Sequence, residues 1–294
     1  KTRLRHLQPW VQAWAEPEMY AGVEGKGAED AAYASALLVE LCNLSGTDFT
    51  GGSADIYKCF DQILRPLVKK VLEEAGMPTK VVSTYTRFID GLTVHNTVAG
   101  GLGEAYRRPT SIPQGDPMSM MVVALLLRPW ILQMRQMAVR PRILADDLQI
   151  IATGERHLSH FQYAYSRTQE HLEDLGAKIA PDKCITFSSS GVAREWLRKH
   201  MWRRLRKTVK VITHCRDLGA HFNVSAEAKY GSTLTESMTQ ATHSTERLDL
   251  HKAPYEKKEK IIRAKILPTG LCGCELSPVN EGALRTVRTA IATC

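Results

Sequence analysis

Two adjacent aspartates, Asp146 and Asp147, interrupt a mostly apolar run over residues 142–151. Each side of the pair is long enough for a short strand, so the pattern predicts a hairpin with both acids at its turn. An ordinary turn accepts Asp for local reasons, and this plain reading stays open for the pair alone. A third acid, Asp55, stands inside a second apolar run over residues 54–60. A buried carboxylate is costly unless a cation neutralises it, so we expect Asp55 and Asp146 to converge and share divalent ions.

Apolar periodicity and the positions of Gly and Pro divide the rest of the chain into short elements. Residues 81–90 and 92–98 fit either a helix or a hairpin, and the pattern does not decide between them. The expected helices are 29–42, 64–75, 118–137 and 157–175, with more helix from 252 onward. The expected strands are 54–60, 178–187 and 217–224, and residues 46–53 are expected to form a glycine-rich turn.

The chain is basic, with 39 Lys and Arg against 31 Asp and Glu, a formal net charge of +8. This excess favours a polyanionic partner, although a merely soluble basic protein would show the same sum. Residues 194–210 concentrate the charge, and Trp196 and Trp202 lie among the cations. Such a mixture suits a nucleic-acid backbone, with a solvated charged face as the alternative. The cations that we expect to bind nucleic acid are Arg203, Arg204, Arg206 and Lys207.

Neither a leader nor a membrane span is apparent. The longest apolar stretch, over residues 118–127, is interrupted by Ser119 and is too short to cross a bilayer, so we expect a core helix and no membrane partner. Seven cysteines without a secretory leader indicate reduced thiols, and the pair Cys272 and Cys274 lacks a second pair at zinc spacing. We therefore expect an intracellular protein that is not secreted.

Five short segments, in one order along the chain, resemble the catalytic motifs of reverse transcriptases. One such segment is weak evidence, whereas five in the family's order are strong evidence. In sequence order they are Asp55-Ile56-Tyr57-Lys58-Cys59-Phe60-Asp61, Ile112-Pro113-Gln114-Gly115-Asp116-Pro117-Met118-Ser119, Leu144-Ala145-Asp146-Asp147, Gly176-Ala177-Lys178-Ile179 followed by Lys183, and Leu218-Gly219.

The resemblance implies an α+β fold, namely a right-hand polymerase palm with partial fingers and a helical thumb. It implies partial fingers over 1–50, a palm over 51–224 with a fingers insertion at about 64–112, and an incomplete thumb over 225–294. The chain would then be an internal fragment, and the expected location is the nucleus if its host is eukaryotic. Its implied function is RNA-directed DNA polymerisation with an RNA template, a DNA primer and a dNTP as partners.

Three further segments are similar to non-LTR (LINE-type) retrotransposon enzymes in particular. A group II intron or bacterial-type reverse transcriptase is the nearest alternative, and a catalytically inactive nucleic-acid-binding relic of the same fold is a second one. The three segments are Gly22-Val23 with Lys26-Gly27, Ile266-Leu267-Pro268, and Gly273-Cys274-Glu275.

The resemblance also assigns roles in catalysis. Asp55 and Asp146, with the main-chain carbonyl of Ile56, would hold two Mg²⁺ ions, or Mn²⁺ in their place. The neighbouring Asp147 would strengthen the negative field without being a full ligand. Lys183 would protonate the departing pyrophosphate.

Nucleotide and primer contacts complete the implied site. Phe60 would exclude the 2′-hydroxyl of a ribonucleotide, and Gln114 and Gly115 would contact the incoming nucleotide. Leu218 and Gly219 would form the turn that grips the primer. The chain departs from the family at Leu144, where an aromatic residue is usual, and it offers no upstream Lys and Arg pair for the triphosphate.

Overall fold

The structure is a computed structural model that describes residues 4–224 and 232–294. The predicted boundary between palm and thumb, at residue 225, lies outside the described residues. At the centre is a five-stranded sheet in the order β4-β5-β1-β6-β7. Its strands are β4 (Arg140–Leu144), β5 (Asp147–Thr153), β1 (Phe49–Asp55), β6 (Ile185–Ser188) and β7 (Lys210–Val211). Neighbours run antiparallel except β6 and β7, which are parallel.

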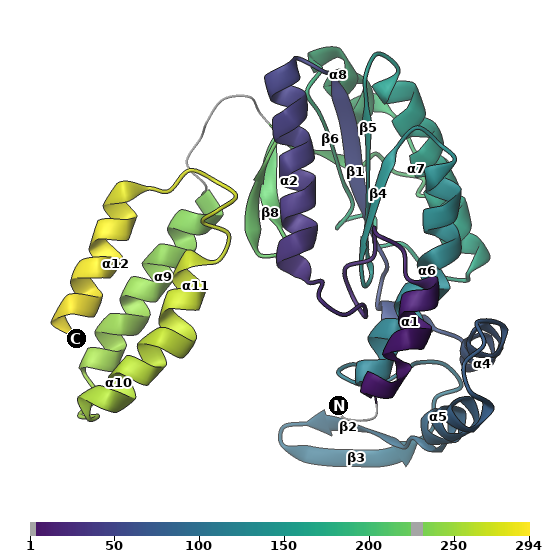
Figure 1. Ribbon diagram of the computed structural model, residues 1–294, viewed down its shortest axis with the longest axis horizontal. Coiled ribbons are helices and arrows are strands. Elements are labelled where there is room, and N and C mark those ends of the chain that lie inside the picture. Colours follow the sequence, from purple (N-terminus) through teal and green to yellow (C-terminus); the bar gives the residue numbers. More distant parts are fainter. Residues whose placement is uncertain (1–3, 225–231) are drawn as a thin grey trace.

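Helices cover both faces of this sheet (Figure 1). Helix α2 (Ala28–Ser45) lies on one face, and helices α6 (Pro117–Arg135) and α7 (His157–Asp174) lie on the other. The main core forms on the α6–α7 side, where Trp130, Phe161 and Tyr165 are almost fully buried against the sheet. Antiparallel strands between helical layers make the fold α+β, as the motif resemblance implies.

Helix α6 is, in the described part of the chain, the one helix long and apolar enough to span a membrane by composition. Most of its apolar window is buried inside the protein, which is the behaviour of a core helix.

The central strand begins earlier than the sequence pattern predicts. Gly51 and Gly52, expected in a turn, lie in the middle of β1, and the strand ends at Asp55 rather than at residue 60. A Cβ added at Gly51 would lie 2.5 Å from the ring of Phe187, and one at Gly52 would lie 2.6 Å from a main-chain oxygen of Ile185. The glycines are therefore required by close packing across the strand and do not mark a turn.

A mainly helical region extends from the end of β1 and returns to α6. Residues 81–90, left open by the sequence, are helical, and residues 94–98 form a strand of an exposed hairpin. Gly22, with φ +74°, packs against the first turn of α6, where a Cβ would lie 2.8 Å from the Met120 carbonyl oxygen. Between β1 and α6 the chain forms α3 (Cys59–Gln62), α4 (Arg65–Glu74), α5 (Thr79–Gly91), β2 (Val94–Val98) and β3 (Gly101–Tyr106). Before β1 it forms the short helices η1 (Leu4–Leu7) and α1 (Gln8–Trp14).

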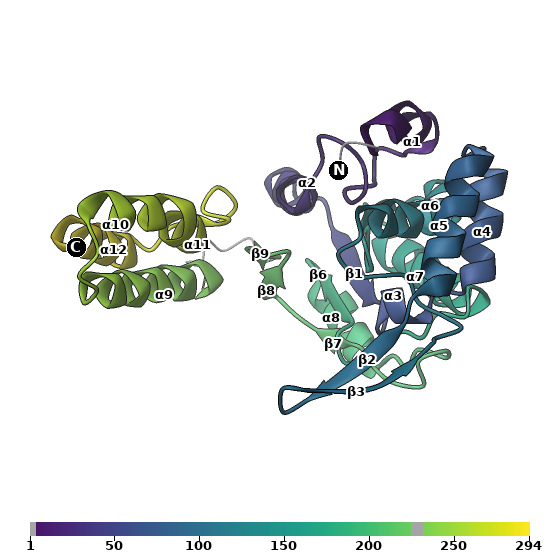
Figure 2. The same ribbon diagram turned by 90° about the horizontal axis from the view of Figure 1, so that it is seen from below.

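The C-terminal part is a separate helical bundle beside a small hairpin (Figure 2). The hairpin has its own two-stranded sheet and lies on the same face as α2, where Phe222 packs with Val39 and Phe187. In the bundle, Gly270 packs directly against Ala241. The remaining elements are α8 (Gly191–Lys199), β8 (His214–Asp217), β9 (Ala220–Asn223), α9 (Ser232–Asp249), α10 (Tyr255–Ile261), η2 (Ile262–Ile266), α11 (Leu267–Leu271) and α12 (Glu281–Thr293).

Candidate active site

The three predicted acids meet at one end of the central sheet. Asp55 is the last residue of β1 and is paired directly with Asp147, the first residue of β5. Residues paired in this way in an antiparallel sheet have Cα atoms about 5 Å apart. Asp146 is the second residue of the two-residue loop, Ala145 and Asp146, that joins β4 to β5. The hairpin and the convergence of its acids with Asp55 are therefore present as the sequence predicts.

The loop that carries Asp146 has an unfavourable backbone conformation. Ala145 has φ +56°, in the left-handed region that non-glycine residues rarely adopt. Leu144 and Asp147 are paired on either side of it, so the ladder between β4 and β5 holds the loop in place. Strain of this kind, of order 1 kcal/mol or more, persists where surrounding structure fixes the turn, and it is frequent at functional sites.

The acids share a poorly solvated environment. Burial raises the pKa of Asp146, and the negative charge of Asp55 raises it further. The buried thiol of Cys59, one turn after β1, feels both acids: its pKa is raised to about 12, mainly by burial and then by Asp146 and Asp55. Two carboxylates that repel each other in a low dielectric attract a cation strongly.

One oxygen of Asp55 is available for such a cation. Asp55 Oδ1 is buried and, among the described residues, accepts no hydrogen bond. The ammonium group of Lys183 lies 3.4 Å from both oxygens of this carboxylate and is itself largely exposed. Lys183 therefore lies beside Asp55, and its role as a proton donor stays a prediction.

The main chain adds a further oxygen. The N–H of Tyr57 donates to Lys178 and the N–H of Ala180 donates to Asp55, so Ile56 turns its own carbonyl toward the side of β5. Within the described ranges, no three His, Cys, Asp or Glu side chains converge to hold a metal by themselves. Mg²⁺ usually binds one or two carboxylates together with substrate phosphates, and Asp55, Asp146 and the Ile56 carbonyl fit that pattern.

Asp147 has different partners from the other two acids. Arg142 Nη2 donates to Asp147 Oδ2 at 2.8 Å, and the same guanidinium also binds Asp217. Burial raises the pKa of Asp147 to about 6, while Arg142 opposes this shift. Sequence reasoning did not identify Arg142, although it lies in the predicted hairpin.

The predicted nucleotide contacts lie on the elements that flank the acids. Phe60 is in α3, partly buried against the main core, and its carbonyl accepts the N–H of Ile112 at 3.0 Å. Gln114 and Gly115 are exposed in the loop before α6, and Gly115 has φ +82°. The cap of α6 is Asp116, whose Oδ1 accepts the N–H of Met118 at 3.3 Å.

This loop borders a groove of about 770 Å³ between α5 and the start of α6. Tyr85 and Phe88 line the groove together with Lys80 and Asp116. Aromatic rings beside a cation suit the stacking of a nucleic-acid base.

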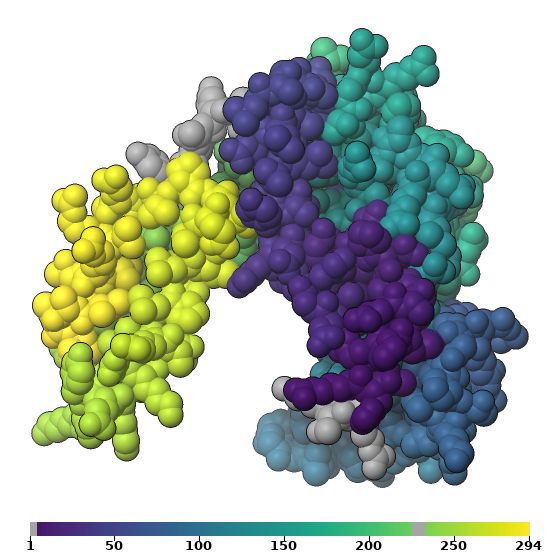
Figure 3. All heavy atoms as spheres, viewed as in Figure 1, coloured from purple at the N-terminus to yellow at the C-terminus, as the bar shows by residue number. Residues whose placement is uncertain are grey.

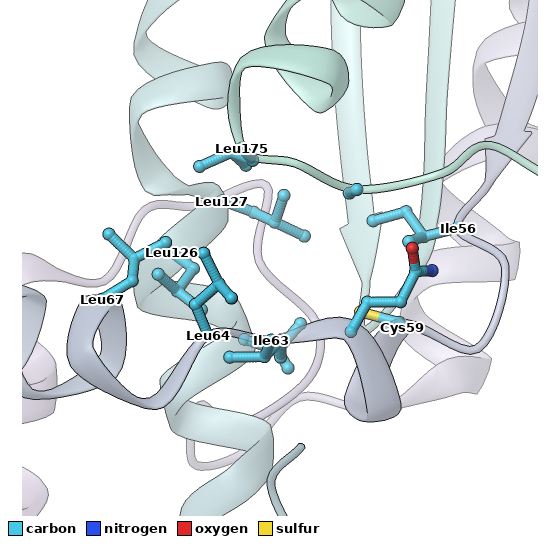
Figure 4. A pocket seen from close by; sticks show the side chains of 11 residues that line it. Ile56, Cys59, Ile63, Leu64, Leu67, Leu126, Leu127 and Leu175 are labelled. Carbon is cyan, nitrogen blue, oxygen red and sulfur yellow. The ribbon is translucent and has the colours of Figure 1, made fainter. Parts of the chain in front are cut away.

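A smaller apolar cavity lies beneath the turn that follows β1 (Figure 4). It measures about 40 Å³, and Ile56, Cys59 and Leu127 are among the side chains that line it. Its lining carries no charged group, so it belongs to the packing under the acids and is not a second ion site.

The turn predicted to grip the primer connects β8 and β9. Leu218 and Gly219 both have positive φ, +50° and +93°, as a two-residue hairpin loop requires. On its far side this hairpin touches the helical bundle: a Cβ at Gly273 would lie 2.8 Å from that of Ala220. The turn therefore contacts the palm and the bundle at once.

The predicted basic segment is exposed but only partly available to a ligand. Arg204 forms ion pairs with Glu170 and Glu173, and Lys207 lies 3.4 Å from Asp182. In the described part of the chain, Arg203 and Arg206 form no ion pair. The tryptophan Trp202 is 1% exposed and packs on Phe161 and Tyr165, so it supports the core and does not face a ligand.

A broad hollow separates the bundle from the N-terminal and β2–β3 regions (Figure 3). The structure does not test the roles predicted for individual residues, which stay predictions.

Comparison with known proteins gives a family and a fold. The family described as reverse transcriptase (RNA-dependent DNA polymerase) matches residues 2–230. Telomerase from Candida tropicalis in complex with a TWJ fragment of telomeric RNA is similar with TM-score 0.56 and 12% identity, over 99% of this chain and 46% of that one. Apo telomerase from the same organism gives TM-score 0.54, 11% identity, and coverage of 99% and 50%. A C-terminally truncated apo form gives TM-score 0.53, 13% identity, and coverage of 76% and 44%.

This chain thus spans half or less of the length of those structures. No curated protein matches it. At these identities the structural likeness shows the fold alone, a polymerase palm of the reverse transcriptase kind.

Proposed function

Because the chain belongs to the reverse transcriptase (RNA-dependent DNA polymerase) family, we propose that it forms the catalytic palm of an RNA-directed DNA polymerase. The observation that carries the proposal is the convergence of Asp55, Asp146 and Lys183 at one end of the sheet. Asp55 Oδ1 is buried and accepts no hydrogen bond among the described residues, and the nearby charges of Asp55 and Asp146 repel each other where a divalent cation would neutralise both.

The residues at the sheet end divide the work of nucleotidyl transfer. Asp55, Asp146 and the Ile56 carbonyl would hold two Mg²⁺ ions, which would supply activation of the primer 3′-hydroxyl and charge neutralisation of the triphosphate. Asp147, half-neutralised by Arg142, adds negative field beside them. Lys183, beside Asp55, is placed to give a proton to the departing pyrophosphate.

Substrate selection depends on the flanking elements. Phe60 occupies the space that a ribose 2′-hydroxyl would need, and Gln114 and Gly115 contact the nucleotide from the loop before α6. The Leu218–Gly219 turn supports the primer, and the RNA template and DNA primer lie in the hollow between the bundle and the palm.

We further propose that the parent protein is a non-LTR (LINE-type) enzyme. The segments around Gly22, Pro268 and Gly273 resemble that class. Gly22 and Gly273 both fill positions where an added Cβ would lie too close to a neighbouring atom. A group II intron or bacterial-type enzyme is the alternative, and a template-switching or intron-splicing assay of the full-length protein separates them.

The main test is primer extension. The chain should extend a DNA primer on an RNA template with Mg²⁺ and dNTPs. Asp146→Asn should lower the extension rate by about a thousandfold, the upper range for loss of one electrostatic group at a reacting centre. Binding of the primer–template should stay within about twofold.

Asp48→Asn is the matched control, because Asp48 stands just before β1 at the opposite end of the strand and is exposed. It should extend the primer at the unmodified rate. Extension by Asp146→Asn at the unmodified rate would refute the role of the acids, and a chain that binds primer–template without any extension would identify the inactive relic.

A further inference from the structure

One buried arginine connects the acid pair to the hairpin that carries the Leu218–Gly219 turn. Arg142, in β4, is 4% exposed. Its Nη1 donates to Asp217 Oδ2 at 2.9 Å, and its Nη2 donates to Asp217 Oδ1 at 3.2 Å and to Asp147 Oδ2 at 2.8 Å. The guanidinium thus grips Asp217 with both arms and holds Asp147 with one of them.

Helix α2 also contacts the Arg142 guanidinium. Arg142 Nη1 also donates to Ser35 Oγ at 3.1 Å and to the Ala31 carbonyl at 3.3 Å. Ser35 in turn donates to Gln149 Oε1 at 2.6 Å. Ser35, Gln149 and Arg142 are all buried, so the hydrogen bonds among them are shielded from water and electrostatically stronger than exposed ones.

The hairpin needs such a link because it is not part of the main sheet. Strands β8 and β9 form their own two-stranded sheet, and a two-stranded hairpin is barely stable alone. Phe222 packs the hairpin against the palm, together with Ile212 just before β8, but apolar contacts are not directional. Asp217 directly precedes the Leu218–Gly219 turn, so a bond at Asp217 fixes the turn in angle and distance.

We propose that Arg142 is a positioning residue that sets the Leu218–Gly219 turn relative to the Asp146–Asp147 loop, and so places the primer terminus at the reacting centre. The placement of the primer rests on the proposed function, whereas the mechanical link between the two hairpins does not. Arg142 acts only through Asp147 and Asp217, without touching substrate.

Stability alone does not account for this residue. Buried ion networks are often replaceable by apolar groups without loss of stability, because desolvation offsets the attraction. Arg142 Nε is also buried and, among the described residues, has no hydrogen-bond partner, an arrangement that is unfavourable for stability. What the guanidinium supplies is a rigid fork that holds two carboxylates at fixed angles, and the single ammonium of a lysine lacks that fork.

The first test is Arg142→Lys, which keeps the charge and removes the fork. Single-turnover extension should show a maximal rate lowered about tenfold or more, since small misplacements of reacting groups are costly. The dissociation constants for dNTP and for primer–template, and the active fraction, should stay within twofold. Asp217→Asn, which weakens the same link from the hairpin side, should give the same pattern.

The matched control is Arg135→Lys. Arg135 also holds carboxylates with both arms, those of Glu16 and Glu18, but among the described residues it forms no ion pair with Asp147 or Asp217. Its maximal rate per active molecule should not change. A merely structural role for Arg142 would lower the active fraction and leave the rate of the remaining molecules intact, and that result would overturn the proposal.

Hydrogen exchange provides a readout that does not need activity. In Arg142→Lys, amides of residues 214–223 should exchange about tenfold faster than in the unmodified chain, while those of 147–153 change little. Unchanged exchange at 214–223, or equal acceleration in Arg135→Lys, would overturn the link. If the unmodified chain fails to extend a primer, the proposed function fails, and the exchange result alone still decides whether Arg142 joins the hairpins.

Discussion

Arg142 and the segment of residues 194–210 are both basic, yet they act in opposite ways. Arg142 is a single cation, 4% exposed, with two carboxylate partners inside the palm. The segment has eight cations, seven of them exposed, and the ion pairs of Arg204 and Lys207 are exposed to water. Exposed pairs contribute about 0–1 kcal/mol, whereas breaking a buried pair costs about 3–5 kcal/mol. Burial, and not the number of charges, decides what a cation does for this fold.

The largest expected effect is the loss of folding stability when the buried ion pairs of Arg142 are removed. Arg142→Met leaves Asp147 and Asp217 facing each other without a cation, so it should lower the free energy of unfolding by about 3–5 kcal/mol. Arg206→Met removes an exposed cation and should change it by less than about 0.5 kcal/mol. Urea unfolding of both variants measures the difference, and equal losses would contradict the comparison.

The second prediction concerns the exposed side, where free and paired cations should differ. Removing Arg203 and Arg206 together should lower the slope of log K for primer–template against log salt by about 2, since each free cation releases about one counterion. Removing Arg204 and Lys207 together should lower it by less than about 1, because protein carboxylates already neutralise them.

Titration of binding at several salt concentrations measures both slopes. Equal slopes for the two double variants would mean that the ion pairs open on binding. An unchanged slope in both would remove the segment from the nucleic-acid interface.

The smallest expected effect concerns a buried histidine. Burial lowers the pKa of His157, whose Nδ1 lies 2.6 Å from Thr50 Oγ1. Below about pH 6.5 the unfolded chain therefore binds a proton that the folded chain resists, so stability falls as the pH falls through this range. The loss of stability between pH 7.5 and 5.5 should be smaller in His157→Gln than in the unmodified chain, as urea unfolding at the two pH values measures.

The exposed His251 is the matched control, and His251→Gln should keep the pH dependence of the unmodified chain. If both variants behave alike, burial of His157 does not contribute to the acid sensitivity.

The acids could be found from the sequence because their positions relative to neighbouring apolar residues form a local pattern. Asp146 and Asp147 between two apolar arms predict a hairpin turn, and the structure has that turn. The ambiguous residues 81–98 divide into α5 and β2, which propensity alone did not resolve, since tertiary packing overrides weak local preferences.

Two features depended on contacts that no local pattern contains. Gly51 and Gly52 resemble a turn until Phe187 and Phe161 are seen to occupy the space of their missing side chains. Arg142 was overlooked because its partner Asp217 is 75 residues away. A faint signal did exist, since Arg142 and Gln149 are polar residues at paired positions in arms that are otherwise apolar.

Gly51 and Gly52, in the middle of β1, determine how the strand that ends at Asp55 is held in the core. With no side chains there, the aromatic rings of Phe161 and Phe187 press on the main chain itself, from opposite faces. Any sideways shift of α7 or β6 is passed directly to the peptide backbone that ends at Asp55, with no flexible side chain to absorb it. A larger residue at Gly51 or Gly52 would therefore push the main chain away from these rings and displace the strand that ends at Asp55.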